Sequence, residues 1–347
     1  MAKIKHKRLK ISIYIISTII VIALVMGLYI RSTVFKQLQL TETAYIYITP
    51  TTSYEEVMNQ IVEKVNLPSD KIFELLLSKM NYAENIKTGR YAIINEMTVP
   101  QMIRMLRSGN QSPVKLTFNN MRTREDLSGR ISEQLMLDSL TLLSALKDAN
   151  QTELLGFDTN TVVAMFIPNT YEVYWDTSVE KLLARMQKEY NTFWNESRKA
   201  KAKAIGLSPV EVSTLASIVE EEATYSDEYP IVAGLYLNRL KRGQRLEADP
   251  TVKFAMGDFA LRRILYKHLE VESLYNTYRN DGLPPGPIRI PSIKSIDATL
   301  SPTDHNYLFM VAKDDLSGRH NFSTTHAEHI RNARKYQRAL NERNIYK

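Results

Sequence analysis

An unbroken apolar run from Ile11 to Ile30 constrains this chain more than any other feature of its sequence. The run contains no charged residue, and a helix of that length spans the hydrocarbon core of a bilayer. Five lysines and arginines precede it with no acid among them, and a single Arg31 follows it. By the positive-inside rule, residues 1–10 are expected to form a cytoplasmic tail and residues 11–30 a single transmembrane helix. Everything after Arg31 is then expected on the outer side of the membrane.

A cleaved signal peptide is the alternative interpretation of this run. The run is longer than the usual apolar core of a signal peptide, and no small-x-small cleavage site follows Ile30. Both observations favour an uncleaved anchor, with residues 31–43 as a linker to the folded part of the chain.

Charge and cysteine content exclude several classes of protein. The formal net charge is +7, but the tail supplies five of these charges, so the rest of the chain is close to neutral. Nucleic-acid binding needs basic residues massed on the folded part, and we therefore expect no nucleic-acid partner. The chain has no cysteine, which excludes disulfides, zinc-thiolate sites and thiol nucleophiles.

Residues 44–118 have the pattern of a small α+β unit. Alternating apolar residues predict strands at 44–49, 89–93 and 114–118, and cap signals predict helices at 53–65, 69–80 and 98–109. The helix starts at Ser53 and Thr98 are marked by Glu56 and Gln101 at capping-box spacing. Because these elements are few and short, a binding or spacer role is the natural expectation, and a plain structural stalk fits equally well.

Beyond a boundary near Asn119, residues 119–347 predict a larger, mixed and mainly helical domain. Helices are expected at 123–135 and 139–147, followed by a long one at 178–204. The predicted fold class of the whole chain is α+β. The two domains are expected to touch, since no low-complexity linker separates them.

One helix of the larger domain carries a candidate acid. Ser208, Pro209 and Glu211 form a strong helix start. The apolar residues that follow at helical spacing are Val212, Leu215, Ala216 and Val219. Helical phase puts Glu222 on this stripe and turns Glu220 and Glu221 away from it. Loss of hydration would raise the pKa of Glu222 toward the range of a general acid. The alternative is an ordinary solvated helix end, with Glu222 in water or paired with a base.

Two later segments offer weaker candidates. Asp249 and Pro250 are typical of a helix entry, where the aspartate could act simply as a cap. Tyr275, Asn276 and Tyr278 precede the stretch 282–288, which is rich in proline and glycine. Amide and aromatic groups beside a stiff loop suit a sugar ligand, and they suit a well-packed core edge at least as well.

His320, His326 and His329 cluster near the end of the sequence. The spacing of the last two could place both on one helix face, but no carboxylate stands at matching ligand spacing. We therefore expect packing and hydrogen-bonding histidines, with no bound metal and no cofactor. Neither a phosphate-binding loop, nor a dinucleotide-binding glycine pattern, nor a G-x-S-x-G elbow occurs in the chain.

Several sequence blocks in order resemble the endolytic murein transglycosylase family, also called MltG or YceG-like. They are LASIVEEEA from Leu215, AGLYLNRL ending at Leu240, RLEADPTVKFAMG ending at Gly257, YNTY from Tyr275, GLPPGPI from Gly282, YLFMVA from Tyr307 and HNFSTTHAEH from His320. The resemblance covers nearly the whole region outside the membrane. It implies an amino-terminal membrane helix, a small LysM-like subdomain at 44–118 and a YceG-like catalytic domain at 119–347.

The resemblance also implies roles for single residues. The catalytic glutamate of the family's A-S-I-x-E-x-E motif falls on Glu222, the residue that helical phase selects, and Glu220 has the place of a supporting acid. The matching blocks supply further candidates for substrate binding or support, namely Ser217, Asn238, Asp249, Thr251, Tyr275, Asn276 and Tyr278. One departure is visible, because Asn169 stands where the family's P-D-T-Y block has aspartate. We interpret that position as structural or substrate-facing.

The activity implied by the resemblance is cleavage within a peptidoglycan strand between N-acetylmuramic acid and N-acetylglucosamine. The product would carry a 1,6-anhydro end, and the enzyme would act as a terminator of glycan elongation in the inner membrane, with its catalytic domain on the periplasmic side. Penicillin-binding synthases and the elongation or division machinery are the implied partners. Two alternatives stay open: a hydrolytic muramidase with Asp249 or Glu220 as second carboxylate, and a non-catalytic scaffold that binds peptidoglycan.

Overall fold

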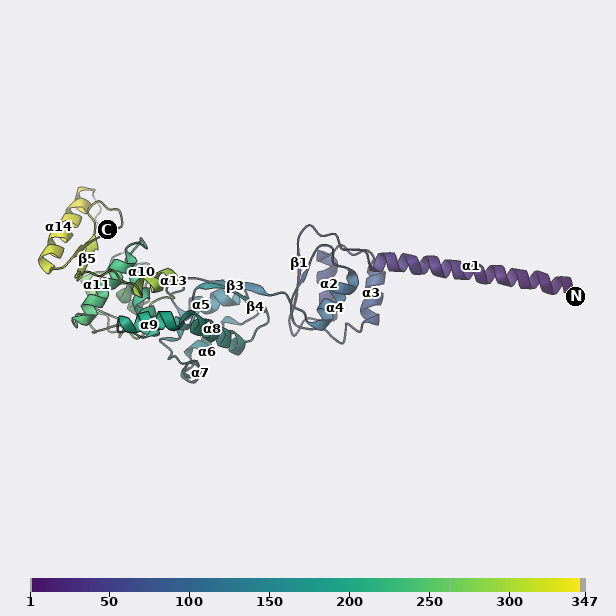
Figure 1. The fold of residues 1–347 in the computed structure, drawn as a ribbon, viewed down its shortest axis with the longest axis horizontal. Coiled ribbons are helices and arrows are strands. Elements are labelled where there is room, and N and C mark those ends of the chain that lie inside the picture. Colours follow the sequence, from purple (N-terminus) through teal and green to yellow (C-terminus); the bar gives the residue numbers. More distant parts are fainter. Residues whose placement is uncertain (1, 262, 344–347) are drawn as a thin grey trace. The chain divides into compact units, whose positions relative to one another are not determined.

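The computed structural model describes residues 2–261 and 263–343 (Figure 1). Three parts of the sequence lie outside the described residues. They are Met1 in the predicted tail, and Arg262 and residues 344–347 in the predicted catalytic domain. The fold is mixed α+β and mostly helical, as predicted. By its contacts the chain divides into two compact units, one of residues 1–114 and 172–176, the other of residues 115–171 and 177–347.

The chain begins with a long helix, α1 (Ala2–Val34). Within it, Lys10–Val34 is long and apolar enough to cross a membrane, and no part of its most apolar stretch is buried against the rest of the chain. Its exposed isoleucines, leucines and valines would be unfavourable in water, because each leaves apolar surface hydrated. This helix therefore has the composition of a single-pass anchor, although an amino-terminal signal sequence has similar properties.

The first unit folds as strand, two helices, strand and helix. Its elements are β1 (Ala44–Ile48), α2 (Tyr54–Lys64), α3 (Asp70–Lys79), β2 (Gly89–Ile93) and α4 (Val99–Ser108). The two strands pair antiparallel, with Ala44 opposite Ile93 and Ile48 opposite Gly89. Their inward side chains pack with those of the three helices into one apolar core. Figure 1 shows α2, α3 and α4 gathered beside β1.

Local sequence signals explain how this unit is built. The predicted capping box at α2 is confirmed, since the Ser53 amide donates to Glu56 at 2.7 Å and the Glu56 amide to Ser53 at 3.2 Å. The edge of β1 is covered by Gln60, whose amide group bonds the backbone N–H and carbonyl of Tyr47 at 3.1 and 2.9 Å. Covering an edge strand in this way removes a site for unwanted pairing.

The second unit is mainly helical and holds the remaining elements. They are β3 (Val114–Phe118, whose first residue belongs to the first unit), α5 (Arg124–Ser132), α6 (Ser139–Lys147), α7 (Ala149–Leu154), η1 (Val162–Met165), β4 (Asn169–Val173, whose last two residues belong to the first unit), α8 (Val179–Phe193), α9 (Glu196–Ala204), α10 (Pro209–Glu222), α11 (Tyr229–Lys241), α12 (Asp249–Met256), η2 (Tyr266–His268), α13 (Ile293–Thr299), β5 (Phe309–Ala312), β6 (His320–Ser323) and α14 (His326–Glu342). Strand β3 pairs with β4, and β5 forms an antiparallel hairpin with β6.

Helix α10 is the centre of this unit. It packs against α9, α11, α12 and α13, and every residue from Val212 to Val219 is buried. The predicted start is confirmed by the reciprocal bonds between Ser208 and Glu211 at 2.7 and 3.3 Å. Because the helix is enclosed on all sides, helical phase does not separate an inward from an outward face.

The prediction that only one of the three glutamates at the end of α10 turns inward is therefore wrong. The side chains of Glu220 and Glu221 are only 7% and 16% exposed. The three carboxylates differ in their partners rather than in the direction they face.

The predicted long helix at 178–204 is also wrong, because the chain forms two helices there. The indole of Trp194 is buried beside Ala202, Val212 and Ala216, and this burial turns the chain after Phe193. Asn195 then caps a new helix by accepting the amide N–H of Arg198 at 3.0 Å. Tertiary packing and a cap residue thus override the continuous helical pattern.

Candidate active site

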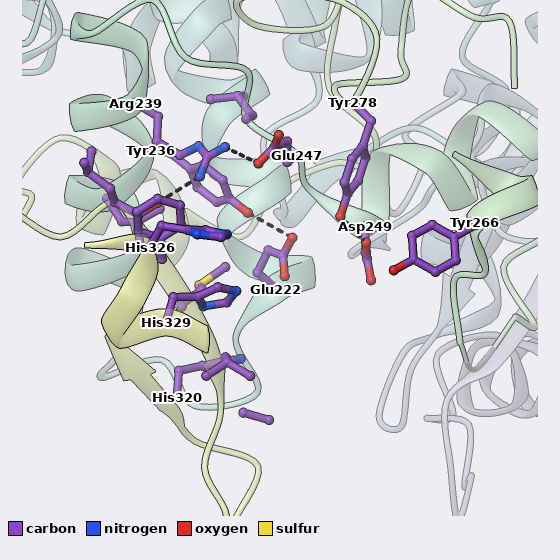
Figure 2. A pocket seen from close by; sticks show the side chains of 17 residues that line it. Glu222, Tyr236, Arg239, Glu247, Asp249, Tyr266, Tyr278, His320, His326 and His329 are labelled. Carbon is purple, nitrogen blue, oxygen red and sulfur yellow. Dashed lines mark hydrogen bonds and ion pairs between the residues drawn. The ribbon is translucent and has the colours of Figure 1, made fainter. Parts of the chain in front are cut away.

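A pocket of about 660 Å³ opens in the second unit at the end of α10 (Figure 2). Its polar lining comes from α10, α11, α12, the segments beside α12, and the carboxyl-terminal hairpin and helix. The residues labelled in Figure 2 are Glu222, Tyr236, Arg239, Glu247, Asp249, Tyr266, Tyr278, His320, His326 and His329. The volume lies within the range of about 300–1,000 Å³ typical of ligand sites.

Glu222, the last residue of α10, points into this pocket. The hydroxyl of Tyr236 donates a hydrogen bond of 2.9 Å to its Oε1 atom. Among the described residues, no hydrogen bond or ion pair reaches its Oε2 atom and no cation pairs with it. Burial raises the pKa of Glu222 to about 8, with the charge of Asp249 adding to the rise and the Tyr236 hydrogen bond and Lys253 opposing it. The carboxyl group is therefore protonated at neutral pH.

Asp249 and Tyr278 form a second polar pair in the pocket. The Tyr278 hydroxyl donates to Oδ1 of Asp249 at 2.7 Å. Burial and this hydrogen bond raise the pKa of Tyr278 above its ordinary range, so the hydroxyl stays a donor. The possible cap role of Asp249 is not realised, because the N-cap of α12 is Ala248 and the aspartate faces the pocket.

Arg239 lines the pocket, and each nitrogen of its guanidinium bonds another part of the chain. Its Nε donates to the Arg245 carbonyl at 2.7 Å and its Nη1 to the Leu308 carbonyl at 2.9 Å, while Nη2 pairs with Glu247. This guanidinium therefore ties α11 to the loop before α12 and to the start of β5.

The carboxyl-terminal segment supplies the opposite wall. His326 and His329 stand in the first turn of α14, and both rings contact Phe309 of β5, at centroid distances of 5.7 and 5.5 Å. Burial lowers the pKa of His329, with His326 and Arg239 contributing, so its ring is neutral. His320 pairs with Glu228 at 2.9 Å. The histidines pack and hydrogen-bond as expected, and they also line the pocket, which the sequence did not reveal.

Beside the pocket, Glu220 and Glu221 belong to a different polar cluster. Oε2 of Glu220 accepts the Ser292 amide at 2.6 Å and the Ser295 hydroxyl at 3.0 Å, at the start of α13. Glu221 pairs with Arg289 and accepts Nη2 of Arg122 at 3.0 and 3.1 Å. Neither residue lines the pocket, so Glu220 supports the fold around the site.

Several other predicted site residues lie outside the pocket and form hydrogen bonds between the segments around it. The hydroxyl of Ser217 accepts the Ile288 amide at 3.0 Å, and that of Thr251 lies 2.8 Å from Thr277. Asn238 donates to the His305 and Tyr307 carbonyls at 2.7 and 3.2 Å, which fixes the chain before β5. These residues support the site and do not face a ligand there.

Asn276 and Tyr275 also differ from the expectation of direct substrate contact in this pocket. The Asn276 side chain is fully buried and donates to the Leu269 and Val271 carbonyls, both at 2.9 Å. The Tyr275 ring packs on Phe254 at 4.7 Å and lines a separate cavity of about 140 Å³. Of the predicted residues, Glu222, Asp249 and Tyr278 are brought together in the pocket.

The stretch 282–288 packs closely against another segment, and Asn169 lies outside the pocket. A Cβ atom on Gly286 would stand 2.3 Å from the Asn160 carbonyl oxygen, so the glycine permits close packing between two segments of the chain. Asn169 begins β4, accepts the Thr170 amide at 2.8 Å and does not line the pocket.

Tyr236 and Arg239 are the main residues that the sequence analysis missed. They share a face of α11 with Val232 and Leu235, at spacings of three and four residues. Two polar side chains on an otherwise apolar helix face could have indicated a buried polar site.

The Glu222 carboxyl group has a raised pKa and one oxygen that faces the pocket. A general acid needs both properties. Within residues 2–261 and 263–343, no group of three or more His, Cys, Asp or Glu side chains has an arrangement that could hold a metal ion.

Residues 46–335 match the family model described as the YceG-like family. This chain belongs to the YceG-like family. The match includes the first unit from Ile46 onward as well as the pocket of the second. The YceG-like assignment rests on most of the chain rather than on the glutamate motif alone.

Named relatives and a solved structure agree with this assignment. The chain is 30% identical over 293 residues to a Bacillus subtilis protein named endolytic murein transglycosylase, covering 80% of each chain. It is 25% identical over 307 residues to a Streptococcus pneumoniae protein of the same name, covering 76% of this chain and 53% of that protein. A crystal structure of a yceG-like protein from Listeria monocytogenes matches with a TM-score of 0.56 and 27% identity, covering 84% of this chain and 98% of that one.

Proposed function

We propose that this chain is a membrane-anchored endolytic murein transglycosylase, with Glu222 as its general acid and base. The observation that carries the proposal is the setting of the Glu222 carboxyl group, which accepts a hydrogen bond from Tyr236 on one oxygen and has the other open to the pocket, and whose pKa is raised to about 8. An acid held protonated at neutral pH is needed to donate a proton to a departing sugar oxygen.

In the proposed reaction, Glu222 gives its proton to the bridging oxygen as the bond from C1 of N-acetylmuramic acid to that oxygen breaks. The C6 hydroxyl of the same N-acetylmuramic acid attacks C1, and its proton passes to the Glu222 carboxylate. The result is a 1,6-anhydro end and a free N-acetylglucosamine hydroxyl, with Glu222 again protonated. No water enters, so one carboxyl group is sufficient.

The hydrolytic alternative would need a second carboxylate that activates water or attacks the sugar. Glu220 is poorly suited, because it is held by Ser292 and Ser295 and does not line the pocket. Asp249 does line the pocket, so a muramidase would use Asp249. Reducing ends in place of anhydro ends would identify that chemistry.

The remaining assignments are part of the same proposal. The strand–helix–helix–strand order of the first unit supports a LysM-like subdomain at residues 44–118, joined by linker 31–43 to the anchor, with a catalytic domain at 119–347. Anchor helix 11–30 would keep the basic tail in the cytoplasm and the catalytic domain on the outer side of the inner membrane. An enzyme so placed would act on nascent strands, terminate their elongation and meet penicillin-binding synthases.

Incubation of peptidoglycan with the full chain in detergent, followed by mass spectrometry of the products, tests the proposal. The wild type should release strands with anhydromuramic ends from internal cuts, and Glu222→Gln should release at most traces in the same time. Glu196→Gln, on an exposed surface of α9, is a matched control that should keep full activity. Intact strands with all three proteins would favour a non-catalytic scaffold.

A further inference from the structure

Tyr266 is the pocket residue that the proposed chemistry leaves without a role. Its side chain lines the same pocket as Glu222, yet it is 91% exposed, more than any other large apolar residue recorded as exposed in the described chain. Its ring makes no ring contact or hydrogen bond with any residue in 2–261 or 263–343. Single exposed apolar residues are common on proteins, so exposure alone would mean little.

Position distinguishes this tyrosine from an ordinary surface residue. In the view of Figure 2 it stands on the side of Asp249 away from Glu222, at the end of the pocket opposite the histidine wall. An enzyme that cuts within a strand must hold sugars on both sides of the cleaved bond. The pocket therefore needs a binding surface some distance from Glu222.

The backbone around Tyr266 is held by hydrogen bonds from side chains later in the chain. Tyr266 opens the short helix η2, and Asn276 holds the two carbonyls that follow this turn, those of Leu269 and Val271. Arg279 donates to the carbonyl between these two, that of Glu270, at 2.9 Å. The loop is thus tied to its own far end, and only the aromatic ring is left exposed.

A tyrosine ring in this setting suits a sugar. A pyranose presents C–H groups on its faces, and stacking on an aromatic face removes apolar area of both partners from water. Tyrosine also loses little conformational entropy on binding, and its hydroxyl can bond a polar group at the ring edge.

We propose that Tyr266 is the stacking platform of a glycan subsite remote from the scissile bond, which sets the enzyme's preference for long strands. The proposal rests on the peptidoglycan cleavage proposed above. It assigns Asn276 as a positioning residue, which holds the loop that carries the platform.

Kinetics of the full chain in detergent on glycan strands of different lengths test the subsite. Tyr266→Ala should raise KM for long strands about tenfold, the size of a lost aromatic contact, with kcat little changed. Tyr266→Phe should behave as the wild type, because the ring remains. Leu274→Ala is the matched control, since Leu274 is 71% exposed in the same region and does not line the pocket.

Binding to isolated glycan strands separates this proposal from the proposed activity. In a Glu222→Gln background, adding Tyr266→Ala should weaken strand binding about tenfold, whereas adding Leu274→Ala should not change it. Equal binding with and without the tyrosine ring would overturn the subsite, even if the wild type cleaves. Weaker binding without the ring would support the subsite even if no cleavage is found.

Discussion

Glu221 and Glu222 are neighbours at the end of α10 and have opposite surroundings. Glu221 lies between Arg122 and Arg289 and forms an ion pair with each. Glu222 meets the Tyr236 hydroxyl on one side and open pocket on the other, and its nearest charges include Asp249. Both are shielded from bulk water, so burial alone does not make a catalytic acid. The difference lies in the partners: Glu221 pairs with two cations, whereas Glu222 has a tyrosine hydroxyl and the pocket, and burial raises its pKa.

The largest expected effect comes from removing the two carboxyl groups in turn. Glu222→Gln should lower turnover about 10²- to 10⁴-fold, the usual contribution of an acid–base group. Glu221→Gln should retain most of the activity, because it removes a charge that does not face the pocket. Rates measured on one peptidoglycan preparation compare the two. Equal losses would mean that the two carboxylates act as one unit.

The next effect is on stability. Arg289→Met should destabilise the second unit by about 3 kcal/mol, because Glu220 and Glu221 lose a buried positive partner. Thermal unfolding of the purified variants measures this loss. The matched control is Arg130→Gln, which breaks the exposed pair with Glu133 and should cost less than about 1 kcal/mol.

The smallest effect is a pair of opposite shifts in the pH dependence of activity. Glu222 must be protonated to act, so kcat/KM should fall as pH rises through about 8. Tyr236→Phe removes a hydrogen bond that favours the ionised form of Glu222, so the fall in kcat/KM should move to higher pH. Asp249→Asn removes a negative charge that favours the protonated form and should move it to lower pH. Measurements of kcat/KM from about pH 5 to about pH 10 would resolve both shifts. Shifts in the same direction would show that another group controls the fall.

Sequence predicted the elements of the first unit better than the arrangement of the site. The cap at Ser53 and the alternation of β1 are local signals, so they could be interpreted without tertiary structure, and the same holds for the Ser208 cap in the second unit. Trp194 shows the limit, because its burial by residues far along the chain interrupts a continuous helical pattern. Local rules have no access to such contacts.

The site shows the same limit. The role proposed for Glu222 comes from its motif, whereas the argument from helical phase fails because α10 is enclosed on all sides. Glu222 differs from Glu221 in its partners, because Tyr236 bonds Glu222 and Arg289 pairs with Glu221. Both partners come from other segments of the chain. The wall of Phe309, His326 and His329 depends on the β5–β6 hairpin folding back on α14, a long-range arrangement.

The protonation state of Glu222 is the central claim, and it can be measured directly. Carbon-13 NMR of the full chain with labelled glutamate carboxyls, compared with Glu222→Gln to identify the signal, gives the pKa of this group. We expect a value of about 8, so that the group is still protonated at neutral pH. A value near the ordinary 4.5 would contradict the account, because Glu222 would then be a carboxylate at neutral pH and could not serve as the acid.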